Sequence, residues 1–102
     1  MVIENHIVDV EVPGPGLYEI TGDLNERLKA LQVESGLMTL FIQHTSASLL
    51  IQENADPSAK RDLEVWLNRL VPENDAIYSH VAEGADDMPA HIKAMLTAVN
   101  LS

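Results

Sequence analysis

The chain has 102 residues, 46% of them hydrophobic and 22% charged, which is typical of one globular domain with a single core. Six Lys and Arg against sixteen Asp and Glu give a formal net charge of −10, which argues against binding to nucleic-acid phosphates. The absence of cysteine excludes disulfides, thiolate metal sites and cysteine nucleophiles. No apolar run spans a bilayer and no export signal opens the chain, so we expect a cytoplasmic protein without a membrane partner.

The first third of the chain predicts a strand, a turn and a helix. Within residues 2–12 the valines occupy alternate positions, which predicts a half-buried strand. Two prolines and two glycines at 13–16 prevent both helix and ladder, so a turn follows. Leucines then recur at helical spacing and predict a helix over about 22–34, ending near Gly36.

The middle of the chain predicts two strand segments separated by a bend. Residues 37–42 are apolar on both parities, as in a strand that is covered on both faces. Residues 45–48 are small and rich in hydroxyl groups, and the apolar run resumes over 49–51. We therefore expect a bend between the two segments, with hydroxyls and backbone amides available to a small ligand.

Two further helices complete the prediction of an α+β fold. Asp56 and Pro57 suit the cap and first position of a helix over 57–70, and a last helix is predicted over about 88–98. This order predicts one domain over residues 1–102, with three helices packed on a mainly antiparallel sheet. The predicted core consists of Leu28, Leu31, Leu40, Ile42, Leu63, Trp66, Leu67, Ile92 and Leu96.

A cluster of histidines and carboxylates surrounds the start of the last predicted helix. Pro89 suits a first helical turn, and Asp87 just before it can cap that turn. His91 follows Asp87 by one helical turn, so both side chains project from the same side. The glycine after Glu83 predicts a turn that brings His80 and Glu83 back toward His91.

These residue types suit a divalent metal ion. With the three imidazoles of His44, His80 and His91 and no thiolate, the chain fits Zn²⁺ or another first-row ion with an open coordination position. An ion of this kind acidifies a bound water or polarises a substrate oxygen. The alternative from spacing alone is structural, because no compact metal motif is present. In that case His44 is a core histidine and the segment before the helix is a solvated acidic turn.

Several motifs together resemble the YjbQ family, small bacterial and archaeal proteins often described as secondary thiamine-phosphate synthases. The resemblance extends over the whole chain in a consistent order, and its last motif is highly specific. It implies an α+β fold, a homotrimer and a polar pocket near a subunit boundary. The motifs are His44-Thr45-Ser46-Ala47-Ser48-Leu49, Glu53-Asn54-Ala55-Asp56-Pro57, Arg61-Asp62-Leu63 and Tyr78-x-His80-x-x-Glu83-Gly84-x-Asp86-Asp87-Met88-Pro89-Ala90-His91-Ile92-Lys93.

The resemblance also implies an activity and a set of site residues. The activity is the low-level joining of a pyrimidine diphosphate to a thiazole phosphate, with Mg²⁺ on the diphosphate easing its departure. The alternative is a non-catalytic module that binds a metal ion or a small ligand. The implied catalytic residues are Glu53, Asn54, Asp56, Glu83 and Asp87, and the implied metal ligands are His44, His80 and His91.

Members of the family continue past the position of Ser102 into further strands and a terminal segment. Relative to the family we therefore expect this chain to be C-terminally incomplete. We expect the apolar faces over 37–42 and 92–99 to need cover from other subunits, most simply in a trimer.

Overall fold

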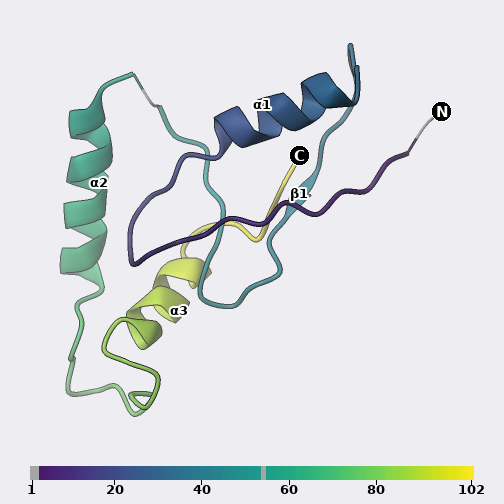
Figure 1. Ribbon diagram of the computed structural model, residues 1–102. Helices are drawn as coiled ribbons and strands as arrows, with labels where there is room; N and C mark the ends of the chain where they lie inside the picture. The colour runs from purple at the N-terminus through teal and green to yellow at the C-terminus, as the bar shows by residue number, and fades with distance from the viewer. Residues whose placement is uncertain (1–2, 54) are drawn as a thin grey trace.

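The computed structural model describes residues 3–53 and 55–102, and these form three helices and two short strands (Figure 1). No helix in this part of the chain is long and apolar enough to cross a membrane. The elements in chain order are α1 (Thr21–Ala30), β1 (Leu40–Phe41), α2 (Pro57–Leu70), α3 (Asp87–Met95) and β2 (Asn100–Leu101).

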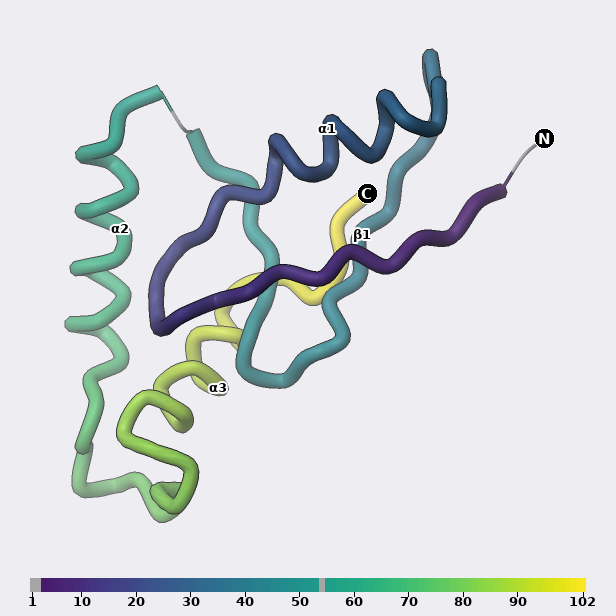
Figure 2. The backbone as a smooth tube through the Cα atoms, viewed as in Figure 1, coloured from purple at the N-terminus to yellow at the C-terminus, as the bar shows by residue number. Residues whose placement is uncertain are grey.

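The sheet is antiparallel but smaller than predicted. β1 pairs with β2, and Leu40 lies opposite Leu101. Over residues 3–12, the described part of the strand predicted for 2–12, no strand forms: they cross the molecule as an extended segment, seen in purple in Figure 2. A strand needs a neighbour to take up its N–H and C=O groups, and the described residues offer this segment none.

A loop interrupts the ladder beyond β1, at the position where the sequence predicted a bend. The N–H of Ile42 donates to the carbonyl of Val99 at 2.9 Å, and the next pairing is between Leu49 and Ala98. Those two residues exchange N–H···O bonds of 2.7 and 3.0 Å. Residues 43–48, which we call the excursion loop, are thereby closed at the base by bonds to the segment that follows α3.

The helices differ from the predictions mainly at their C-terminal ends. α2 spans 57–70 as predicted. α1 ends at Ala30 and not at 34, because Gln32 takes a left-handed φ of 55°. The N–H groups of Gln32 and Val33 then bond back to Lys29 and Leu28, a Schellman closure. α3 ends at Met95 and not at 98, because Ala98 is drawn into the bridge with Leu49.

The core is much thinner than predicted. Of the described residues only Val71 and Pro89 are buried. Trp66 is 58% exposed and Leu96 57%, so their assignment to the core is wrong for the single chain, and the other predicted core residues are half-buried. The radius of gyration is 16.1 Å. A compact domain of this length has one of about 13 Å.

Polar contacts hold α2, which stands at one side of the molecule (Figure 1). The carboxylate of Glu64 accepts the N–H of Leu17 at 3.2 Å. The ammonium of Lys93 on α3 donates to the side-chain carbonyl of Asn68 at 2.6 Å. Both contacts are polar, so they bring little apolar surface against α2. Trp66 on this helix accordingly stays exposed.

Asp56 caps α2, and its removal is expected to loosen that helix. Its carboxylate accepts the N–H of Ser58 at 2.9 Å, which lowers the pKa of Asp56 below its usual 3.8. Because the pKa of Asp56 is lowered, the capping bond stabilises the folded chain at any pH above the usual pKa of an aspartate. This stabilisation is lost as the pH falls through the lowered pKa of Asp56 in the folded chain. At neutral pH, Asp56→Ala should reduce by a few degrees the temperature at which helical ellipticity disappears. Near pH 2 it should leave that temperature unchanged. Asp62→Ala, within the same helix, is the control; an equal effect of both substitutions would contradict the cap.

Candidate metal site

Four side chains that can ligate a metal ion meet at the start of α3. They belong to His80, Glu83, Asp87 and His91. One donor atom from each lies within 4.8 Å of all the others. The first two residues lie on the loop before α3, and the other two lie one helical turn apart on α3 itself.

The Asp87 carboxylate is the centre of the group. Its Oδ2 lies 2.8 Å from Nε2 of His80 and 3.2 Å from Nε2 of His91. Nε2 of His80 is also 3.6 Å from Oε2 of Glu83. The two imidazole rings meet edge to face, with centroids 5.5 Å apart and planes at 68°. Both Nε2 atoms therefore face a single carboxylate oxygen.

The loop before α3 reverses at Gly84 and so returns His80 to the helix. Gly84 has φ of 112°, a conformation that side chains other than hydrogen rarely allow. The prediction that Asp87 caps α3 is wrong: Asp86 holds the cap position, and its side chain makes no capping bond. Asp87 is the first helical residue, and its carboxylate turns toward the imidazoles.

The backbone of the excursion loop sets the protonation of His91. Nδ1 of His91 lies 3.0 Å from the carbonyl oxygen of Thr45. A carbonyl only accepts, so Nδ1 carries the proton and the neutral ring has its lone pair on Nε2. That lone pair faces Asp87 Oδ2, an arrangement that requires a cation between the two atoms, either a proton or a metal ion. Metal-ligating histidines commonly donate their other N–H to a backbone carbonyl in this way.

Asp87 is ionised at neutral pH, as a metal ligand must be. Burial acts to raise its pKa, but hydrogen bonds to His80 and Glu83 and the charges of the imidazoles act to lower it. The net effect is a pKa below the usual 3.8. The carboxylate side chain is only 18% exposed, whereas that of Glu83 is 66% exposed, so Asp87 is the better-shielded ligand.

The distances suit a small tetrahedral ion after a minor adjustment. Ligand atoms 2.0–2.1 Å from a tetrahedral Zn²⁺ are about 3.4 Å apart. The three close separations in the group are 2.8, 3.2 and 3.6 Å. Opening the 2.8 Å separation by about half an ångström would bring His80 and Asp87 to the spacing of zinc ligands, and the 3.2 Å between His91 and Asp87 is already close to it.

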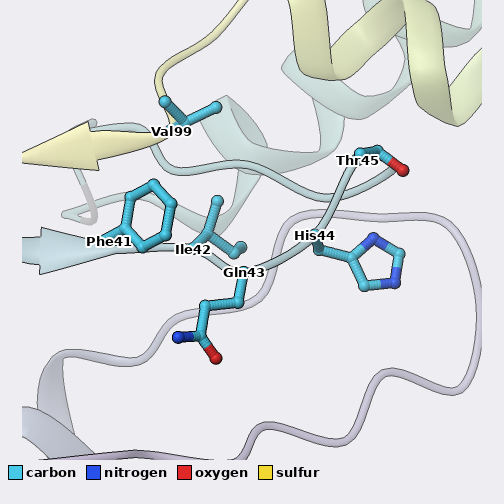
Figure 3. A pocket seen from close by; sticks show the side chains of 6 residues that line it. All are labelled: Phe41, Ile42, Gln43, His44, Thr45 and Val99. Atoms are coloured by element: carbon cyan, nitrogen blue, oxygen red, sulfur yellow. The ribbon is translucent and has the colours of Figure 1, made fainter.

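The structure does not bring His44 into this group. Its Nδ1 accepts the N–H of Ser46 at 2.9 Å, so the neutral ring carries its proton on Nε2 and has no lone pair free for a metal ion. His44 lines an open cavity of about 610 Å³ (Figure 3). The cavity is lined by Phe41, Ile42, Gln43, His44, Thr45 and Val99.

Two further candidates, Asp56 and Glu53, also lie outside the metal group. Asp56 caps α2. Glu53 is exposed, and its backbone N–H bonds to the side chain of Gln52. Asn54 lies outside the described residues. No sequence pattern indicated the Thr45 carbonyl as a partner of His91, because every residue carries a backbone carbonyl.

Fold and site together define a small α+β protein with a histidine and carboxylate group at a helix start. The family model described as UPF0047 protein YjbQ-like matches residues 7–102, and the chain belongs to this family. It is 44% identical over 91 residues to the UPF0047 protein sll1880 from Synechocystis. It is 46% identical over 87 residues to the UPF0047 protein YjbQ from Salmonella typhimurium. These matches cover 89% and 84% of this chain, and 62% of the length of each relative.

Two solved structures share the fold. A conserved hypothetical protein from Thermus thermophilus superposes with a TM-score of 0.75 and 37% identity, over 93% of this chain and 72% of that one. An uncharacterised conserved protein of the YjbQ/UPF0047 family from Clostridium acetobutylicum gives a TM-score of 0.70 and 36% identity. That match covers 82% of this chain and 62% of the other.

Proposed function

We propose that His80, Asp87 and His91 bind a divalent first-row cation, with Glu83 as an outer or exchangeable fourth ligand. The observation that carries the proposal is the placement of His91, whose Nδ1 faces a backbone carbonyl while its Nε2 faces the Asp87 carboxylate. Nε2 and the carboxylate must share a cation, and a divalent metal ion can take that place instead of a proton. The exposure of Glu83 would leave the fourth position accessible to water or substrate. An ion held in this way lowers the pKa of a bound water or polarises an oxygen ligand.

The donor set favours Zn²⁺ over Mg²⁺ and Ca²⁺. Two imidazole nitrogens with one or two carboxylates suit zinc and its first-row neighbours. Magnesium and calcium select oxygen ligands, and Mg²⁺ keeps several waters in near-octahedral geometry. The group offers two nitrogens among its four donors.

A metal-dependent transfer reaction is the second part of the proposal. The YjbQ resemblance suggests thiamine-phosphate synthase activity, in which a diphosphate leaves a pyrimidine. Lys93 is the basic residue of α3, and its ammonium is already bonded to Asn68. A diphosphate at this site would thus rely on the cation for neutralisation.

Metal titration tests the proposal directly. Protein stripped with a chelator should bind Zn²⁺ at one site per chain in calorimetry. His91→Ala should lower the affinity by more than about 100-fold, because even outer-shell changes cost 10–100-fold. His44→Ala is the matched control and should change the affinity less than about threefold, since His44 lies outside the group. Equal losses in the two variants would contradict this assignment.

An assay with a pyrimidine diphosphate and a thiazole phosphate separates the enzyme from the binding module. Turnover that appears with the metal and is lost in His91→Ala would support the synthase. Saturated metal binding without turnover, in a chain extended to the length of its relatives, would favour the non-catalytic module.

A further inference from the structure

We propose that Ser48 and Thr97 are positioning residues for the metal site, because they hold the excursion loop so that the Thr45 carbonyl orients His91. The inference rests on the proposed metal function and adds two residues that are not among the candidate ligands. Both hydroxyls are half-buried, and they join the end of the loop to the residues just after α3.

The direction of the hydrogen bonds can be deduced. Thr97 Oγ1 donates to the carbonyl of Lys93 at 3.2 Å, and a hydroxyl has only one proton. Thr97 Oγ1 must therefore accept from the Ser48 hydroxyl, which lies in short contact with it. The result is a chain of bonds from Ser48 through Thr97 to the last turn of α3. This chain ties the loop to the helix that carries Asp87 and His91.

The backbone reinforces this connection on either side of the loop. The bond from Ile42 to Val99 and the paired bonds between Leu49 and Ala98 close its base. In Figure 3 the loop rises from Phe41 through His44 to Thr45, beside the segment that bears Val99. Thr45 near the middle of the loop reaches His91 by its carbonyl at 3.0 Å. The position of that carbonyl thus depends on how the loop end is held at Ser48.

Loss of the hydroxyl chain should release the Thr45 carbonyl from Nδ1 of His91. The neutral ring would then be free to place its proton on Nε2, where it can bond Asp87 but cannot ligate a metal ion. Outer-shell partners of ligating histidines contribute 10–100-fold to metal affinity. We expect a loss of that size without any change in the ligands themselves.

The experiment compares two isosteric substitutions in the purified protein. Thr97→Val removes the hydroxyl of the chain, and Thr39→Val removes a hydroxyl that bonds Ser102 at the far end of the ladder. Zn²⁺ affinity should fall about 10–100-fold in Thr97→Val and less than about threefold in Thr39→Val, while Thr97→Ser restores it. Long-range ¹H–¹⁵N spectra of the metal-free protein above pH 8 should show the Nδ1–H form of His91 in the parent, and its depletion in Thr97→Val.

Ser48→Ala provides a second variant should Thr97→Val fail to fold, because it removes the donor and leaves the bond from Thr97 to Lys93. An unchanged tautomer and unchanged Zn²⁺ affinity in Thr97→Val or Ser48→Ala would overturn the inference. If the parent itself bound no Zn²⁺, the metal function would fail, and the tautomer spectra alone would decide whether Ser48 and Thr97 position His91.

Discussion

Asp87→Asn is expected to lower Zn²⁺ affinity by more than about 100-fold, the largest effect of any single substitution in the group. Asp87 Oδ2 lies within 3.2 Å of both imidazoles, so the amide would remove a charged ligand and the group that both rings face. An amide also presents an N–H donor to Nε2 of His91, and this donor would occupy the lone pair of the neutral ring in place of the metal ion.

The matched control is Asp86→Asn, one residue earlier and outside the group. It carries the same change in charge, so it measures the general loss of attraction for cations from an acidic surface. Calorimetric titration of both variants and the parent, at one pH and salt concentration, checks the prediction. Similar losses for Asp86→Asn and Asp87→Asn would show that the protein attracts Zn²⁺ by net charge alone.

Local signals predicted the parts of the structure that depend on nearby residues. α2 has the predicted bounds because Asp56 and Pro57 define its start and Pro72 follows its end. The close approach of His80 to His91 depends on one turn at Gly84 and one turn of helix, and both can be inferred from the sequence.

Features that depend on distant pairing were not predictable. The bridge between Leu49 and Ala98 shortens α3 and places the Thr45 carbonyl on His91, and no local pattern encodes it. The apolar periodicity that placed Trp66 in the core reports which face of α2 is apolar. It does not report whether the same chain supplies the surface that covers that face.

The second large effect concerns that uncovered surface. Leu37, Ile51 and Ile77 are each more than 80% exposed, and Phe41 and Trp66 more than 55%. Full burial of one such side chain contributes about 1.5–3 kcal/mol, so covering five of them is comparable to the 5–15 kcal/mol stability of a typical domain. We expect the 102-residue chain alone to self-associate and to melt over a broad range.

A chain extended to the length of its relatives should behave differently, because this one spans 62% of the length of the Synechocystis and Salmonella relatives. We propose that the extended chain forms a homotrimer that covers these faces and melts cooperatively. Light scattering gives the mass of both chains in solution, and calorimetry gives the width of each transition. A monodisperse, cooperatively melting monomer of the 102-residue chain would contradict this expectation.

The central claim is that His80, Asp87 and His91 hold a divalent cation, and anomalous diffraction tests it most directly. Crystals equilibrated with Zn²⁺ should show one strong peak at the zinc edge, about 2.0–2.2 Å from Nε2 of both histidines and from a carboxylate oxygen of Asp87. The bond from His91 Nδ1 to the Thr45 carbonyl should remain. A zinc peak elsewhere on the chain, with Nε2 of both histidines still hydrogen-bonded to Asp87, would contradict this claim.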